Sequence, residues 1–166
     1  EEDVLGVLEG LMADILRKTL GAEVELPLRR LTYADVMDRY GVDKPDTRFG
    51  LELVNISDVF DSCGFMVFRE VVENKGLVKS INIKGGASMS RSQIDALIAF
   101  SQEQGAGGMA WMKRTANGFE SSIVKFFEPE TLDRLDERLA AEPGDLLVFV
   151  ADLLDLRRTL VAPTEP

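Results

Sequence analysis

The chain has 166 residues and a net charge of −10 from 19 basic and 29 acidic residues, a balance that disfavours nonspecific binding of nucleic acid by the chain as a whole. Hydrophobic residues make up 45% and charged residues 29%, which fits one folded domain and excludes a chain that is disordered throughout. The absence of histidine excludes histidine bases, Ser-His-Asp triads and histidine metal sites, and the single cysteine, Cys63, excludes a disulfide framework or a CxxC site within the chain.

The first third of the chain predicts two helices. Residues 3–20 have apolar side chains at helical spacing, with acids at the start and Arg17 and Lys18 before Gly21. Residues 33–40 form a shorter candidate helix that begins after Thr32, a suitable N-cap. The charged stretch 43–48 contains a proline that prevents helix continuation, so we expect a loop there.

The middle of the chain predicts a β-hairpin. Residues 49–54 are expected to be extended, and residues 57–62 to form one or two helical turns. The apolar run 65–68 is interpreted as a strand that continues toward Val72. Residues 74–76 supply turn chemistry, and residues 78–83 alternate as a second strand.

The last part of the chain alternates helices and strands. Ser90 begins a helix as its N-cap, with Gln93 three residues later as a capping-box partner. Short or buried strands are expected at 109–112 and 146–150, and a helix that opens with Pro129 is expected through Ala141. A final short helix is expected at 153–161.

These elements together predict the α+β class. The expected architecture is a small, mostly antiparallel sheet covered by helices on one face, with an amphipathic N-terminal helix whose apolar face needs a partner. No apolar run approaches the roughly 20 residues that span a bilayer, so we expect no transmembrane helix and no membrane partner.

The charge distribution singles out one basic segment. Residues 69–125 carry 8 basic and 5 acidic residues, whereas the segments on either side are acidic. The basic residues of this segment are candidates for phosphate contacts with nucleic acid. The alternative is that they are ordinary solvated side chains. The candidates are Lys79, Lys84, Arg91, Lys113, Arg114 and Lys125.

A glycine pair supplies a candidate anion loop. Gly85 and Gly86 follow a predicted strand and precede the helix that begins after Ser90, so free amides there could face a phosphate. The alternative is a turn that needs a positive φ at one of the glycines. The glycines at 105–108 follow a helix instead, and we interpret them as a helix stop and a tight turn.

Two single residues carry alternatives of their own. Cys63 has apolar neighbours and is interpreted as a buried structural thiol rather than a nucleophile. Trp111, the only tryptophan, is interpreted as a core residue, with base stacking as the alternative.

Six stretches together resemble one enzyme family. Their order and spacing are similar to those of bacterial-type aspartyl-tRNA synthetases over residues 1–152. The string Asp43–Leu53, with its DKPD-x-RFGLEL pattern, is the most specific part. The other stretches are Leu31–Gly41, Gly85–Ala87 with Ser90 and Arg91, Gly108–Lys113, Ser122–Phe126 and Pro143–Asp152.

The resemblance implies a domain organisation. In that family the region lies between the second and third class II motifs and contains an insertion domain shared with a subunit of the archaeal tRNA-dependent amidotransferase. Residues 1–49 would then be a flanking segment of the class II catalytic domain itself, and residues 50–152 would be the insertion domain. Residues 153–166 depart from the family pattern and would be a C-terminal extension or the end of an excised piece. The start at Glu1 also predicts a piece of a longer protein.

The resemblance implies a function as well. The parent would be a cytoplasmic ligase that uses ATP and Mg²⁺ to attach aspartate to tRNA, with no cofactor and no catalytic residue in this piece. The piece itself would dock the aspartate-accepting tRNA or a partner, would contact the rest of the synthetase chain and is a candidate for homodimer formation. The alternatives are the homologous domain of the amidotransferase subunit and a protein-interaction scaffold without nucleic-acid contact, which the net charge favours.

Overall fold

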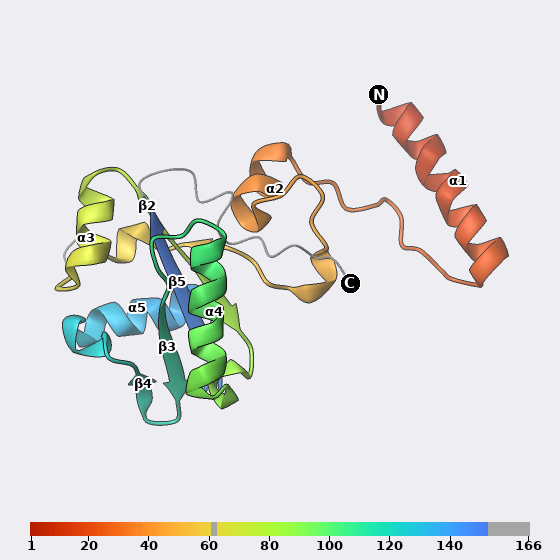
Figure 1. Cartoon of the computed structure of the whole chain (residues 1–166). Helices are drawn as coiled ribbons and strands as arrows, with labels where there is room; N and C mark the ends of the chain where they lie inside the picture. The colour runs from red at the N-terminus through yellow and green to blue at the C-terminus, as the bar shows by residue number, and fades with distance from the viewer. Residues whose placement is uncertain (61–62, 153–166) are drawn as a thin grey trace. The chain divides into compact units, whose positions relative to one another are not determined.

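The computed structural model describes residues 1–60 and 63–152, so the helix expected at 153–161 lies outside the described residues. The chain divides into two compact units, Glu1–Thr32 and a second unit that begins at Tyr33 (Figure 1). We describe each unit by itself.

The first unit is built on α1, Glu2–Leu20, in agreement with the predicted helix. Glu2 and Asp3 lie in the first turn and Arg17 and Lys18 in the last, and Gly21 ends the helix in the left-handed conformation. The segment after the helix returns along it, because Arg30 donates to the carboxylates of Glu2 and Glu9. No residue of α1 is buried.

The second unit contains a five-stranded sheet. The strands are β1 (Val54–Asn55), β2 (Leu77–Ile83), β3 (Ala110–Thr115), β4 (Gly118–Glu120) and β5 (Leu146–Asp152). Their order is β1-β2-β5-β3-β4, and each neighbouring pair is antiparallel. The last strand in the chain, β5, is therefore central in the sheet, which explains why the run 146–150 is continuously apolar and buried. The predicted α+β class and the antiparallel sheet are confirmed.

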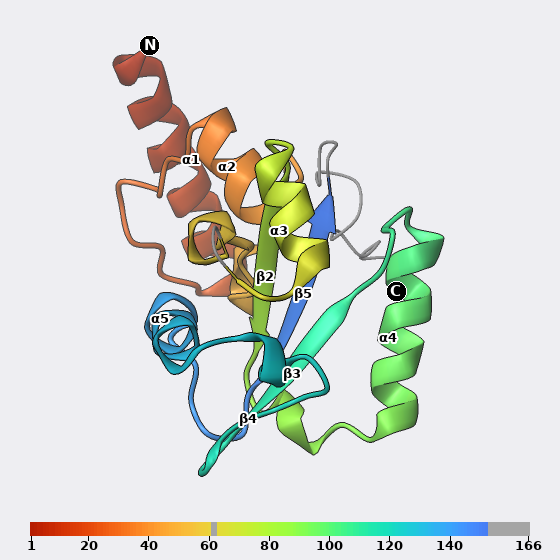
Figure 2. The ribbon, with the colours of Figure 1, turned by 90° about the vertical axis from the view of Figure 1, so that its left-hand side faces the viewer.

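Helices pack on both faces of the sheet (Figure 2). Helices α3 (Met66–Glu73) and α5 (Pro129–Leu139) share a core with Val78, Met112 and Phe149. Helix α4 (Arg91–Glu103) packs through Ile94 on Leu146 and Val148, which point to the other face. The prediction of cover on one face only is wrong. Successive side chains of β5 point to opposite faces of the sheet, and all five residues 146–150 are apolar and buried, so both faces are covered.

The predicted hairpin of 65–72 with 78–83 is also wrong. Residues 66–73 form α3, and β2 pairs with β5 over seven residues instead. A run of four apolar residues does not distinguish strand from helix by itself. The helix is selected because Phe65, Phe68 and Val72 recur at spacings of three and four and together face the core.

Several local predictions are confirmed. Ser90 caps α4 in a complete capping box with Gln93. Pro129 occupies the first turn of α5. Helix α2 runs from Tyr33 to Tyr40, as expected, and Val36 is its buried residue. The hairpin of β3 and β4, which turns at Asn117-Gly118, was not predicted.

Residues around α2 pack with the sheet unit. Lys79 of β2 donates to the carboxylate and the carbonyl of Asp38, and Arg39 pairs with Glu52. The Leu53 N–H donates to the Arg39 carbonyl at 2.7 Å. The sheet unit thus includes α2, although the family resemblance places the start of the insertion domain at residue 50.

Candidate nucleic-acid interface

A buried carboxylate organises the loop that was predicted to bind an anion. Asp145, 3% exposed, precedes β5. Its Oδ1 accepts from the Gly85 N–H at 3.0 Å, and its Oδ2 accepts from the Glu142 N–H at 2.9 Å. Asn82 Nδ2 and Lys84 Nζ donate to the same Oδ2 at 3.1 and 2.9 Å. The Gly85 amide therefore binds the protein's own carboxylate.

Gly86 and Ser90 also have internal roles. Gly85 has a φ of 70°, the positive angle of the turn alternative. A Cβ at Gly86 would lie 2.8 Å from the Leu146 Cβ, so the loop packs closely on β5. The Ser90 N–H donates to the Gln93 side chain at 2.8 Å. The assignment of these three residues to an external anion stays a prediction, and each has a structural explanation of its own.

The Asp145 network implies a pH dependence of stability. Burial raises the pKa of Asp145, but the hydrogen bonds from Glu142, Lys84, Gly85 and Asn82 outweigh burial and lower the pKa from 3.8 to about 2. Because the folded-state pKa lies below the unfolded one, the carboxylate stabilises the fold above about pH 4, and this contribution is lost as the pH falls toward 2. It amounts to on the order of 2 kcal/mol.

Urea unfolding of the wild type and Asp145→Asn, from pH 7 down to pH 3, tests this dependence. The wild type is expected to be more stable at pH 7, and the difference in unfolding free energy should shrink below pH 4. A difference that stays constant over the whole range would contradict the assignment.

Three of the six predicted cations pair with carboxylates of other elements. Lys79 has a side chain only 6% exposed and contacts Asp38 at 2.7 Å. Lys84 pairs with Asp145, and Arg114 binds both carboxylate oxygens of Asp136 on α5. This Asp136 contact raises the pKa of Arg114. We call Lys79, Lys84 and Arg114 the paired cations.

Within the described residues, the other three cations form no ion pair with a carboxylate of another element. Arg91 pairs with Asp95 one turn along α4, and its guanidinium lies 5.5 Å from the centre of the Trp111 ring. Lys113 Nζ donates to the Met89 carbonyl at 2.7 Å. Lys125 Nζ lies 5.1 Å from the centre of the Phe126 ring. We call Arg91, Lys113 and Lys125 the surface cations.

The six residues do not gather on one face. Arg91 and Lys113 lie together on the α4 side of β3, whereas Arg114, the next residue along the strand, points to the α5 side. Lys125 lies in the short helical turn Val124–Phe126, apart from both groups. Sequence reasoning identified the basic segment but not which of its charges are already paired.

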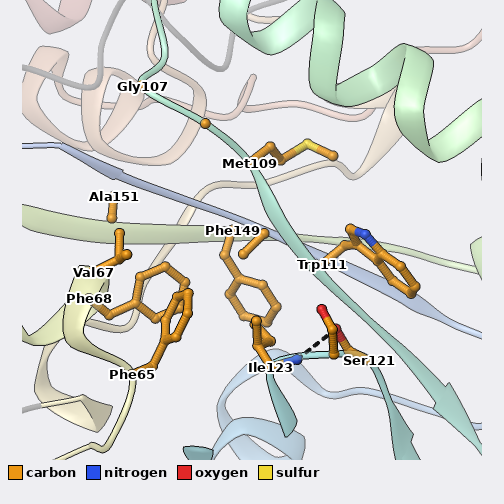
Figure 3. Close-up of a pocket in the computed structure, with 13 residues that line it drawn as sticks. Phe65, Val67, Phe68, Gly107, Met109, Trp111, Ser121, Ile123, Phe149 and Ala151 are labelled. Atoms are coloured by element: carbon orange, nitrogen blue, oxygen red, sulfur yellow. Dashed lines mark hydrogen bonds between the residues drawn. The ribbon is translucent and has the colours of Figure 1, made fainter.

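A groove that sequence reasoning missed opens beside β3 (Figure 3). It has a volume of about 510 Å³. Phe65, Val67 and Phe68 from the start of α3 form one wall, and residues 121–123 form another. Phe149 and Ala151 contribute from β5, and the five consecutive residues 107–111 border it, from the segment before β3 into the start of that strand. None of these residues is charged.

The groove follows an uncovered stretch of strand edge. The Arg114 N–H donates to the Asp145 carbonyl at 2.8 Å, so the Arg114 backbone faces β5. Backbone groups alternate along a strand, which turns the N–H and C=O of Trp111 to the opposite edge. Strand β4 pairs only with Lys113–Thr115 there. Among the described residues, no strand covers the outer edge of β3 at Trp111.

Metal and thiol chemistry add no site in the part of the chain that the structure describes. No cluster of three or more Asp, Glu, His or Cys residues suited to a metal ion is present among those residues. Cys63 is buried, its thiol contacts the Phe65 carbonyl at 3.6 Å, and burial raises its pKa. Within the same described ranges, no helix is long and apolar enough to cross a membrane.

The fold and the groove define the class of the protein. An antiparallel sheet with helices on both faces places it in the α+β class, with an uncharged groove at one strand edge. The GAD domain family matches residues 68–157, more than half of the chain, and the chain belongs to this family.

Curated relatives extend the match beyond that domain. The chain is 50% identical over 151 residues to the aspartate–tRNA(Asp/Asn) ligase of Geotalea uraniireducens, covering 91% of this chain and 26% of the relative. It is 51% identical over 151 residues to the Moorella thermoacetica ligase of the same name, covering 91% and 25%. The Bacillus subtilis ligase is 47% identical over 157 residues, covering 94% and 26%. The chain thus spans about a quarter of these relatives, and the resemblance to bacterial aspartyl-tRNA synthetases is confirmed.

Proposed function

We propose that this chain is the non-catalytic insertion domain, with a flanking segment, of an aspartate–tRNA ligase and that it docks tRNA. The observation that carries the proposal is the identity of about half over 91% of the chain to ligases of which it spans only a quarter. The ATP and Mg²⁺ chemistry of such a ligase then belongs to the other three quarters of the parent protein, in the cytoplasm. The partners are the aspartate-accepting tRNA and the rest of the ligase chain.

The amidotransferase subunit remains the second candidate function, because a GAD domain alone does not decide between the two. The similarity at residues that precede the matched domain favours the ligase, since the relatives align over 91–94% of the chain. The segments on either side of this region in the complete protein decide the question, because only the ligase carries class II motifs there. A second copy of the chain, as in a homodimer, stays a proposal that sedimentation would test.

The surface cations give the docking proposal its phosphate contacts. Replacing Arg91, Lys113 and Lys125 together by Gln is expected to weaken tRNA binding and to reduce the slope of log affinity against log salt by about 2 to 3, since each lost phosphate contact removes roughly 0.7–0.9. Replacing the paired cations should instead lower the stability of the fold. Fluorescence anisotropy with a labelled tRNA across a salt series measures the slope.

A matched control removes the same charge elsewhere. Lys18, Arg29 and Lys44 are exposed and lie outside the basic segment, so their triple Gln variant changes net charge equally. It should leave the salt slope close to that of the wild type. If the two triple variants have equal salt slopes, the surface cations do not contact the tRNA phosphates.

A further inference from the structure

We propose that the groove beside β3 binds an unpaired nucleotide of the docked RNA. This inference rests on the proposed function and names the part of an RNA that the domain recognises. It takes its support from three features of the groove, namely an aromatic wall, an uncovered polar strand edge and an uncharged lining whose aromatic residues have cations next to them.

The aromatic wall suits a nucleobase. Phe65 is only half-buried, and its ring packs edge-on against Phe68 with centroids 4.8 Å apart, which fixes its orientation (Figure 3). The ring of Phe126, which does not line the groove itself, lies 5.6 Å from that of Phe65 and is 40% exposed. Unpaired bases stack on such rings, and the bases of a duplex are already stacked on each other.

The polar edge suits the hydrogen-bonding rim of a base. The N–H and C=O of Trp111 face the groove side of β3 where β4 no longer pairs. The Ser121 hydroxyl accepts from the Ile123 N–H at 3.4 Å, which leaves its proton to donate, and Ser122 lies beside it in the lining. A flat, uncharged ligand with donors and acceptors on its rim matches this arrangement.

The charges complement a nucleotide rather than an acidic or purely apolar ligand. The lining itself is uncharged, which suits the neutral ring of a base. Two cations adjoin its aromatic residues without lining it. Lys125 lies 5.1 Å from the centre of the ring of Phe126, which contacts Phe65, and Arg91 lies 5.5 Å from the centre of the ring of Trp111. Phosphates that precede and follow an inserted base would meet these cations, so the charge arrangement favours a nucleic acid over a protein strand at this edge.

Trp111 provides a local reporter, because it is the only tryptophan of the chain and borders the groove. Its fluorescence is followed while the full chain is titrated with a short single-stranded oligoribonucleotide or with the same strand annealed to its complement. We expect the single strand to quench Trp111 and the blunt duplex to leave it unchanged at equal phosphate concentration.

Variants at two adjacent residues distinguish an effect on the groove from a general effect of added negative charge. Val67 lines the groove and is 55% exposed, whereas Met66 precedes it on α3, is 58% exposed and does not line the groove. Val67→Glu should weaken binding of the single strand by roughly tenfold or more, because it places a carboxylate where the base enters. Met66→Glu adds the same charge and should change the affinity by less than about twofold. Thermal melts of both variants check that the fold is retained.

The outcomes distinguish this inference from the proposed function. If tRNA and both oligonucleotides raise the anisotropy alike, while Trp111 stays unquenched and the two variants behave the same, the groove inference is overturned and docking stands. If no RNA binds in any assay, the proposed function fails together with the inference. If Trp111 is quenched without RNA, to an extent that depends on protein concentration, a second copy of the chain occupies the groove. That result would overturn the proposal of a bound nucleotide.

Discussion

Asp145→Asn is expected to lower the free energy of unfolding by about 2–3 kcal/mol at pH 7, because a buried carboxylate with four donors loses its charge. The new amide NH₂ would also face N–H groups that need an acceptor. The melting temperature should fall by roughly 10 °C. Urea unfolding and calorimetry measure both quantities.

The control for this variant is Asp43→Asn. Asp43 is exposed and its replacement removes the same charge, so its effect should stay within about 0.5 kcal/mol. Similar losses for the two variants would mean that net charge, rather than the Asp145 network, determines the result. A large loss only at Asp145 supports the assignment of Gly85 to an internal carboxylate rather than to an external anion.

Phe68→Ala is expected to destabilise the fold by about 3–5 kcal/mol, the range for a large buried aromatic side chain. Phe68 is 2% exposed, and its ring lies 4.8 Å from that of Phe60 and 6.0 Å from that of Phe149. Removing it opens a cavity between α3 and the centre of the sheet. Equilibrium unfolding in urea measures the loss.

Val67→Ala is the comparison that makes this test specific to the helix. Val67 is 55% exposed and should lose less than about 0.5 kcal/mol. A helix places Phe65 and Phe68, three residues apart, on the core side, whereas a strand would place Phe65 and Val67 on the same face. If Val67→Ala costs as much as Phe68→Ala, the helical assignment of 66–73 is contradicted.

The sequence was informative where the signal is local. The capping box of Ser90 and Gln93 and the proline at the start of α5 use residues within one turn of each other, and both were predicted. The Phe65–Phe68 run was misread because its partners, Phe60 and Phe149, are brought to it by the fold. The dipeptide Asn117-Gly118 is a strong local hairpin signal, and it lies at the turn between β3 and β4.

The site was less predictable because it depends on distant pairings. Lys79 and Asp38 are 41 residues apart, and Lys84 and Asp145 are 61 apart, so composition alone cannot separate the paired cations from the surface cations. The groove combines four segments that are distant in the sequence, from Phe65 to Ala151. The glycines that border it predict only a turn. The domain organisation was indicated by the resemblance to aspartyl-tRNA synthetases and not by the spacing of residues.

The most direct test of the central claim is the binding of this chain to the aspartate-accepting tRNA and to an unrelated tRNA at low and physiological salt. The account predicts binding that persists at physiological salt and prefers the aspartate-accepting tRNA. Absence of binding, or equal binding to both tRNAs that disappears as salt is raised, would contradict it and would place tRNA recognition in the remaining three quarters of the parent protein.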